Sequence, residues 1–398
     1  MIAYNSGELD KQEIREEVQS AYRQGLITET AYKDINTSYP EYFYSPNIFI
    51  RIGLFILTLI IAIFGLGLLL LMGAVDSERG IRGFSVFIAV VAYAACEMMI
   101  HGKKHYKSGV DTASMWMCGA ALCTFYFMMD LVDTGTSLYA FLFVVSAYFT
   151  LRFADVPMAI IAYGSLMMVI FVNLDNSGAR AFLPFVIMLL SIGAYFGIKA
   201  LARKTIARHY KYCLTFLEIC ALLTLYMSMN YFVVNELNNE YDPAGPYIDD
   251  SYPEGTPVPP PAKPLALAWL FWTTTIALPL LYIYFGLRKK DRILLGTGLL
   301  LLAAATFTVR YYHSIMPLEG AMVLAGIIMI TIAWSVIRYL KVPKHGFTNE
   351  DDDEKGAIEK LHLESLVITQ TMGQQQQVET TKGYGGGSGI GGGASGDF

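Results

Sequence analysis

The sequence contains few charged residues, and this shortage sets the class of protein. Asp, Glu, Lys and Arg make up 16% of its 398 residues, whereas soluble domains carry about 25%. Hydrophobic residues make up 54%, and the mean hydropathy is +0.43. So few polar side chains do not cover a folded surface in water, which argues against a soluble domain. The net charge of −5 provides no basic face for phosphates, so nucleic acid is not expected as a partner.

Catalytic and metal-binding motifs are also missing. The chain has no H-E-x-x-H, G-x-S-x-G or Walker motif. His101 and His105 have the i, i+4 spacing of a metal pair, but Lys103 and Lys104 between them repel a cation, which favours an interfacial loop. The cysteines show no C-x-x-C spacing and fall inside apolar runs, which predicts packed thiols. We therefore expect no enzyme, no cofactor and no metal site.

Long apolar runs dominate what the sequence does contain. A helix of about 20 apolar residues crosses a hydrocarbon core of about 30 Å. Ten runs reach or approach this length, which predicts an all-α, polytopic transmembrane bundle of about ten spans. They are residues 49–73, 84–100, 113–132, 137–152, 156–173, 181–200, 212–235, 265–286, 293–309 and 319–340. The fourth and fifth are short and are separated by Asp155 and Pro157, so an eight-span alternative treats 137–173 as one re-entrant pair.

The basic residues favour one orientation in the membrane. Short cytoplasmic loops are enriched in Lys and Arg. Basic clusters recur after alternate spans, in the loops near residues 103–107, 152, 199–211 and 288–292, while the intervening loops are poor in them. This pattern predicts that both ends of the chain are cytoplasmic. The first ten residues lack the basic region and short apolar core of an export signal, so the first span is expected to stay as an anchor in the lipid bilayer.

Residues 1–47 are predicted to form a soluble helical hairpin followed by an aromatic interfacial segment, YPEYFYSPN. Asp10 and Glu13 have the spacing of a capping box at the start of a first helix. Gly25 is placed to end it, and Thr28 to cap a second helix, whose Tyr32 should pack back on the first. Two such short helices are marginal alone, so the hairpin is expected to dock on the membrane domain or on a protein partner.

Two stretches carry a resemblance to a known family. YRQGLITETAYKDI resembles the helical hairpin that opens an uncharacterised bacterial family of predicted multi-pass membrane proteins, whose first helix typically ends in a Gly-Leu-Ile-[Ser/Thr] turn. FTVRYYHSIMPLEGAMVLAGIIMITIAWSVIRYLK is similar to the last two spans of such proteins. The resemblance covers the two ends, and the middle by span count. It implies a multi-pass protein of a bacterial inner membrane and no particular activity, since the family has no established catalytic residues.

The remaining regions are a membrane domain and a tail. The membrane domain is expected over 48–342, with a Pro- and Tyr-rich outer loop at 236–264. The tail, 343–398, is acidic and then rich in Gln and Gly, a composition that buries too little to fold. It is predicted to be a disordered tether, with capture of its end by a partner as the alternative.

Ionisable residues inside predicted spans are the candidate functional sites, because burying a charge in lipid costs roughly 2.5–3.5 kcal/mol even on lenient scales. Glu218 lies about 10 Å into the membrane from Lys211, at ~1.5 Å per residue. Glu97 lies one turn from the cytoplasmic edge, with His101 at i+4, and Asp130 marks the outer end of the third span. The alternative for each acid is a structural ion pair with a nearby base. A possible polar lining comes from four neutral residues: Asn230, Thr273, Thr274 and Thr275.

Three functions are compatible with these features. The first is a non-catalytic sensor or scaffold, suggested by the docked hairpin, the long tail and the few buried charges. The alternative is a proton-coupled transporter or carrier that uses Glu218, assisted by Glu97. A membrane-embedded enzyme is the least favoured, because no acid–base pair has a convincing spacing.

Overall fold

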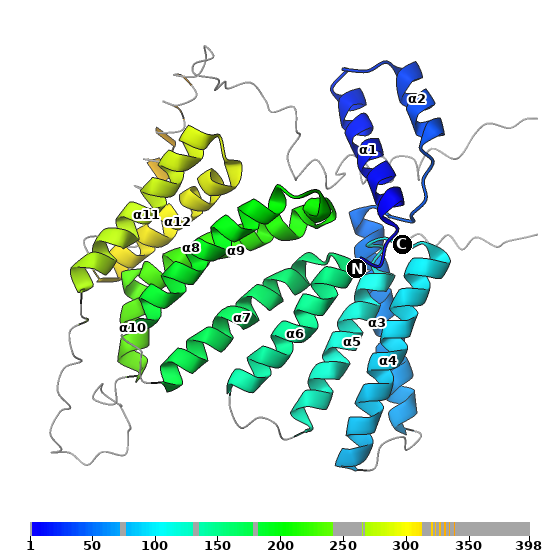
Figure 1. Ribbon diagram of the computed structural model, residues 1–398, viewed down its shortest axis with the longest axis horizontal. Coiled ribbons are helices and arrows are strands. Elements are labelled where there is room, and N and C mark those ends of the chain that lie inside the picture. The colour runs from blue at the N-terminus through cyan, green and yellow to red at the C-terminus, as the bar shows by residue number, and fades with distance from the viewer. Residues whose placement is uncertain are drawn as a thin grey trace, which may run out of the picture. The chain divides into compact units, whose positions relative to one another are not determined.

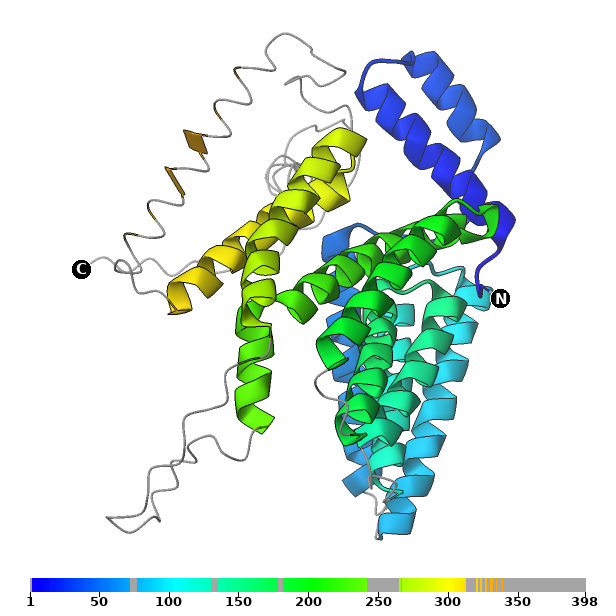
Figure 2. The ribbon, with the colours of Figure 1, turned by 60° about the vertical axis from the view of Figure 1, so that its left-hand side comes forward.

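The computed structural model describes residues 2–71, 77–129, 135–177, 182–241, 265 and 267–312, with single residues between 320 and 338. Within these ranges the chain forms 12 α-helices and no extended strand, as the all-α prediction requires (Figures 1 and 2). The Gly-rich tail, the outer loop 242–264 and most of the predicted span 319–340 lie outside the described residues.

The first two helices form the predicted hairpin, α1 (Ser6–Arg23) and α2 (Glu29–Ser38). Gly25 has φ +71°, and the N–H of Leu26 donates to the carbonyl of Ala21, so the predicted end of α1 is confirmed. The Thr28 hydroxyl accepts from the N–H of Ala31 and caps α2 as predicted. The rings of Tyr22 and Tyr32 stack at 4.6 Å between the two helices.

The predicted capping box at the start of α1 is wrong. The helix begins a turn earlier, because the Asn5 side chain accepts from the N–H of Gly7 and serves as the N-cap. Asp10 and Glu13 are therefore inside the helix, where both face Arg208, 195 residues from Glu13. The two side chains that the local pattern assigned to a helix cap instead form long-range ion pairs with Arg208.

Eight helices of the described part are long and apolar enough to cross a membrane. They are α3 (Ile48–Leu71), α4 (Glu78–Lys103), α6 (Gly135–Phe153), α7 (Val156–Asn176), α8 (Leu183–Ala202), the stretch Ala207–Met229 that contains α9 (Lys211–Met229), α11 (Ala268–Lys289) and α12 (Arg292–Tyr312). The shorter α5 (Val110–Phe127) matches the predicted span 113–132 but is more polar. Since α6 and α7 are about 28 and 31 Å long at ~1.5 Å per residue, each is long enough to be a separate span.

Neighbouring helices pair along the chain. α4 packs on α5, α6 on α7, α8 on α9 and α11 on α12 (Figure 1). Each pair is joined by a short connection, such as Ala154–Asp155 between α6 and α7, where Asp155 accepts from the N–H of Met158 and caps α7 as predicted. α9 links the pairs, since it also contacts α7, α11 and α12. Basic clusters lie in or beside three of these connections, and the single Arg152 lies at the end of α6, next to the fourth.

The predicted span 212–235 is not one helix. α9 ends at Met229, Asn230 is extended with φ −78° and ψ 127°, and α10 (Tyr231–Tyr241) starts in a new direction. The break is stabilised from α11, because the N–H of Tyr231 donates to the Thr275 hydroxyl and the Thr274 hydroxyl donates to the carbonyl of Met229. An apolar run alone did not reveal a break whose partners lie about 45 residues further on.

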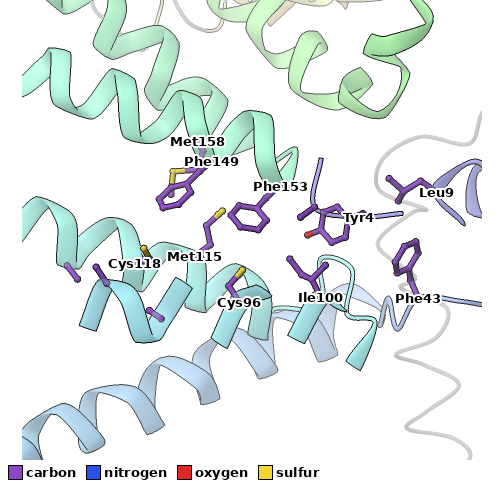
Figure 3. Close-up of a cluster of buried hydrophobic side chains, with 14 residues drawn as sticks. Tyr4, Leu9, Phe43, Cys96, Ile100, Met115, Cys118, Phe149, Phe153 and Met158 are labelled. Carbon is purple, nitrogen blue, oxygen red and sulfur yellow. The ribbon is translucent and has the colours of Figure 1, made fainter. Parts of the chain in front are cut away.

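The largest buried cluster joins the first residues of the chain to α4, α5 and α6. Figure 3 shows the ring of Tyr4 beside Phe153 and Ile100, with Leu9 and Phe43 on the other side. Met115, Phe149 and Met158 continue the cluster into the bundle. The segment before the hairpin is thus part of the core of the membrane domain rather than a free end.

Candidate functional sites

Glu97 lies in a network of ion pairs and hydrogen bonds between α4 and α6. Nε and Nη2 of Arg152 donate to its two carboxylate oxygens at 2.8 and 3.0 Å. Tyr93 donates to Oε1 at 2.9 Å and pairs with Tyr148. The predicted contact with His101 is present, with Nδ1 3.1 Å from Oε2. Two parallel hydrogen bonds between a guanidinium and a carboxylate are the geometry of a strong ion pair, so these contacts match the ion-pair alternative for Glu97.

Glu218 lies in a second group, which we call the Lys199 cluster: Lys199 on α8, Glu218 on α9 and Asp291 before α12. The Glu218 side chain is 9% exposed, and its Oε1 lies 3.2 Å from Nζ of Lys199. Apart from this ion pair with Lys199, that oxygen has no hydrogen-bond partner among the described groups. Lys199 also binds the carboxylate of Asp291 and lies over the ring of Tyr195 at 5.1 Å. The Lys199 ammonium therefore pairs with two carboxylates, that of Glu218 on α9 and that of Asp291 before α12.

Asp291 has a further source of stabilisation. Its Oδ1 accepts from the N–H groups of Ile293 and Leu294, so it caps the first turn of α12. Burial raises the pKa of Asp291, but the bond from Lys199 and these N–H groups outweigh it, and the pKa lies below the usual value. Asp291 thus remains a carboxylate, and Glu218 is the acid of the cluster with the fewest donors.

The structure keeps Glu97 and Glu218 in separate networks. Glu97 binds a base on α6, whereas Glu218 binds a base on α8. The prediction that Glu97 assists Glu218 in a carrier therefore has no support in these contacts. Asp130, the third candidate, lies outside the described residues.

The predicted neutral lining has a structural role at the break after α9. The Asn230 amide donates to the hydroxyls of Tyr226 and Thr308 at 2.8 and 3.1 Å. Thr274 and Thr275 bond to the backbone on either side of Asn230. Thr273 does not join them, since it is exposed and its hydroxyl donates to the carbonyl of Trp269 on its own helix. Three of the four predicted residues are thus brought together by hydrogen bonds around Asn230.

Sequence reasoning missed a polar pocket beneath Tyr4. It is a small cavity of about 10 Å³, roughly the room for one water molecule. We call it the Tyr4 pocket; it is lined by Tyr4, Cys96, Lys107, Asp111, Thr112, Met115, Phe153 and Asp155. Asp111 is fully buried at the start of α5 and accepts from the N–H groups of Ser108 and Gly109 and, at 3.4 Å, from the Tyr4 hydroxyl.

Burial controls the electrostatics of the Tyr4 pocket. It raises the pKa of Tyr4 well above the usual value, helped by the charge of Asp111. It also raises the pKa of Asp155 and lowers that of Lys107. Water is therefore largely excluded from this pocket, and its acidic and basic groups depend on one another for stabilisation.

A local signal for Asp111 was present in the sequence. Ser108, Gly109 and Asp111 form a turn-and-cap pattern before an apolar run. Gly109 has φ +101°, and a Cβ there would lie 2.2 Å from the carbonyl oxygen of Arg51, so only glycine fits against α3. The pattern predicts the turn but not its burial, because the segment 2–5 that covers it is more than 100 residues away in the sequence.

A Ser, a His and an Asp also meet at this turn. Nδ1 of His105 lies 2.6 Å from the Ser108 hydroxyl, which donates to Asp111. In a hydrolytic triad the histidine lies between the other two groups, and the serine faces the substrate. Here Ser108 lies between its partners and is 0% exposed. The arrangement braces a turn and does not form a nucleophile.

Comparison of the chain with family models, with curated proteins and with solved structures finds no match.

Proposed function

We propose that this chain is a multi-pass protein of a bacterial inner membrane, with about ten spans and both ends in the cytoplasm, that acts as a non-catalytic sensor or scaffold. Its cytoplasmic hairpin receives a protein partner, and the membrane domain responds. The eight membrane-length helices support the multi-pass class. The basic residues in or beside the four short connections support the orientation, since Lys and Arg are enriched on the cytoplasmic side.

One observation carries the proposed function: the segment before the hairpin is built into the membrane domain. The N–H of Ala3 donates to the carbonyl of Arg152 at 2.7 Å, and Arg152 in turn holds Glu97. Tyr4 packs against Tyr106 and Phe43 at ring distances of 4.8 and 6.1 Å. A force on α1 is therefore transmitted directly to the connection between α6 and α7.

The hairpin also presents a surface that the rest of the described chain leaves open. α2 has no buried residue, and Leu26 at the tip is 72% exposed. Glu16, Glu17 and Asp34 are exposed as well. Protein interfaces commonly have an apolar centre and a polar rim, and Leu26 among these charged residues has that arrangement.

Site-specific photo-cross-linking in cells tests this proposal. A photoreactive amino acid at Leu26 should form a protein adduct that mass spectrometry identifies. The matched control is Leu300 on α12, which is similarly exposed (62%) but faces the lipid in a spanning helix. Adducts at Leu26 and not at Leu300 support a partner of the hairpin. Identical patterns at both positions contradict it.

The Lys199 cluster favours a second candidate function, a proton-coupled carrier. The observation behind it is that Oε1 of the buried Glu218 has Lys199 as its one partner among the described groups, and that this lysine is shared with Asp291. A carboxylate with unsatisfied capacity is suited to bind and release a proton. Proton influx into dye-loaded vesicles under a membrane potential should exceed that of empty vesicles and fall to their level in Glu218→Gln. Glu29→Gln, an exposed acid of α2, provides the charge-matched control. Equal flux in Glu218→Gln and the unchanged protein would sink this function.

A further inference from the structure

The contacts of the segment Ile2–Asn5 differ in strength from those of the hairpin that follows it. Ala3 and Tyr4 are buried, and they close the Tyr4 pocket over Asp111, Lys107 and Asp155. Among the residues of this segment, Tyr4 alone lines the pocket. Its hydroxyl is 3.4 Å from Asp111, at the long end of hydrogen-bond distances, so the fit depends mainly on the packing of the ring.

The hairpin is attached to the membrane domain mainly by charge. Nε of Arg208 donates to Glu13 at 2.5 Å, and Nη1 lies 3.6 Å from Asp10. His209 lies 3.8 Å from the same aspartate. Leu9 is the one buried residue of α1, and α2 has none. Exposed ion pairs contribute little and are screened by salt, so this attachment is weak compared with the packing of Tyr4.

The other end of the hairpin is fixed separately. Beyond α2, the N–H of Tyr44 donates to the carbonyl of Lys104, and the N–H of Tyr106 donates to the carbonyl of Tyr44. Phe43 is buried beside Tyr106. The hairpin thus has a firm attachment at 43–44, close to the first span, and a weaker one along α1.

We propose that the segment Ile2–Asn5 is a removable plug of the Tyr4 pocket, and that the Arg208 ion pairs add to the packing of Tyr4 and Leu9 that keeps it closed. This inference rests on the proposed function, in which a partner pulls the hairpin. Loss of the Arg208 contacts lets α1 swing about the attachment at 43–44. Tyr4 then leaves the pocket, Arg152 loses its contact with Ala3, and water reaches Lys107, Asp111 and Asp155.

Cys96 provides a native reporter of this movement. It is 1% exposed, lines the Tyr4 pocket, and lies on α4 below Tyr4 (Figure 3). The full chain with Cys118, Cys123, Cys213 and Cys220 replaced by alanine keeps Cys96 as its single thiol. In lipid nanodiscs, a small water-soluble maleimide should label Cys96 slowly. The labelling rate should rise roughly three- to tenfold in Arg208→Glu, which reverses the weak pairs that hold α1.

Three variants separate the plug from other causes. Arg208→Glu combined with Glu13→Arg restores the pair with its charges exchanged, and should return the rate toward that of the parent. Lys33→Glu makes the same change of charge in α2, where Lys33 pairs with Glu29 inside the hairpin, and should have no effect. Tyr4→Ala should label at least as fast as Arg208→Glu, because it shortens the plug itself.

A second reporter distinguishes opening of the pocket from general loosening. Cys118 belongs to the same buried cluster but does not line the pocket, so a chain with Cys118 as its single thiol should label at an unchanged slow rate in Arg208→Glu. Equal rises at Cys96 and Cys118 would overturn the plug, and so would a Cys96 rate unaffected by both Arg208→Glu and Tyr4→Ala. The measurement needs no partner, so its outcome is independent of the cross-linking test of the proposed function.

Discussion

The two ends of the spanning helices are held together by different chemistry. At the end that carries the short basic connections, the contacts between helices are ionic, with Glu97 on Arg152 and Glu218 and Asp291 on Lys199. At the other end, around the break after α9, they are neutral hydrogen bonds and stacked rings, with Asn230 on Thr308 and Tyr231 on Trp272. The ion pairs thus lie on the side where the positive-inside pattern concentrates basic residues, which supplies each buried acid with a partner.

The contacts at the two ends also differ in how they respond to pH. Acid–base pairs titrate and are weakened when one partner is changed alone. The amide, hydroxyl and indole groups around Asn230 carry no charge between acidic and neutral pH. A change of pH should therefore alter the contacts between helices at the end with the ion pairs, and leave the hydrogen bonds around Asn230 unchanged.

The largest effect should come from breaking the ion pair of Glu97. Arg152→Leu leaves a partly buried carboxylate without its bidentate partner, and should lower the free energy of unfolding by about 3 kcal/mol. The measurement is unfolding by denaturing detergent in mixed micelles. The double variant Glu97→Leu with Arg152→Leu removes both charges and should recover most of the loss. A double variant no more stable than the single one would show that the guanidinium acts through packing instead.

A smaller effect should follow at the neutral end. Asn230→Ala removes the hydrogen bonds that the amide donates to the hydroxyls of Tyr226 and Thr308 at the break, which should cost about 1–3 kcal/mol. The loss should be the same at acidic and neutral pH, unlike that of an ion-pair variant. Thr273→Val is the control, since Thr273 is exposed and bonds only within α11 in the described part. A pH-dependent loss in Asn230→Ala would contradict the contrast between the two ends.

The smallest effect should come from Asp155, at the edge of the Tyr4 pocket. Burial raises its pKa in the folded chain, although the N–H of Met158 and the charge of Lys107 oppose this. The folded chain therefore binds the proton more tightly than the unfolded chain does, so the free energy of unfolding decreases as the pH rises through the raised pKa. Asp155→Asn keeps the cap of α7 and removes the titration. Its unfolding free energy should depend less on pH across the acidic range and exceed that of the parent by under about 1 kcal/mol at neutral pH. A steeper dependence would contradict the assignment.

The features that sequence predicted best depend on local chemistry. Apolar runs located the eight membrane-length helices because lipid demands long apolar segments. Gly25 and Thr28 ended and began the helices as predicted, since both act within a few residues of their own position. His101 was found as a partner of Glu97 for the same reason, as it is one turn away.

The features that were missed depend on residues far apart in the chain. Arg152, the main partner of Glu97, is 55 residues away, and Lys199 and Asp291 are separated by 92. Asp111 is buried by Tyr4, 107 residues before it. Apolar periodicity shows which residues leave water, but it does not show which helix pair places a base beside a given acid.

α3 differs from every other membrane-length helix in a way that bears on how the protein is made. It is the most apolar of the eight, none of its residues is buried, and among the helices it contacts mainly α5. It can therefore enter the bilayer alone as soon as it is synthesised. α9 differs from α3 because its polar contacts involve other helices. Glu218 pairs with Lys199, which is synthesised just before it, and Asn230, the residue after α9, bonds to Thr308, which is synthesised 78 residues later. During synthesis α3 can thus anchor the chain on its own, whereas the contacts of α9 and the residue after it are completed only when α12 arrives.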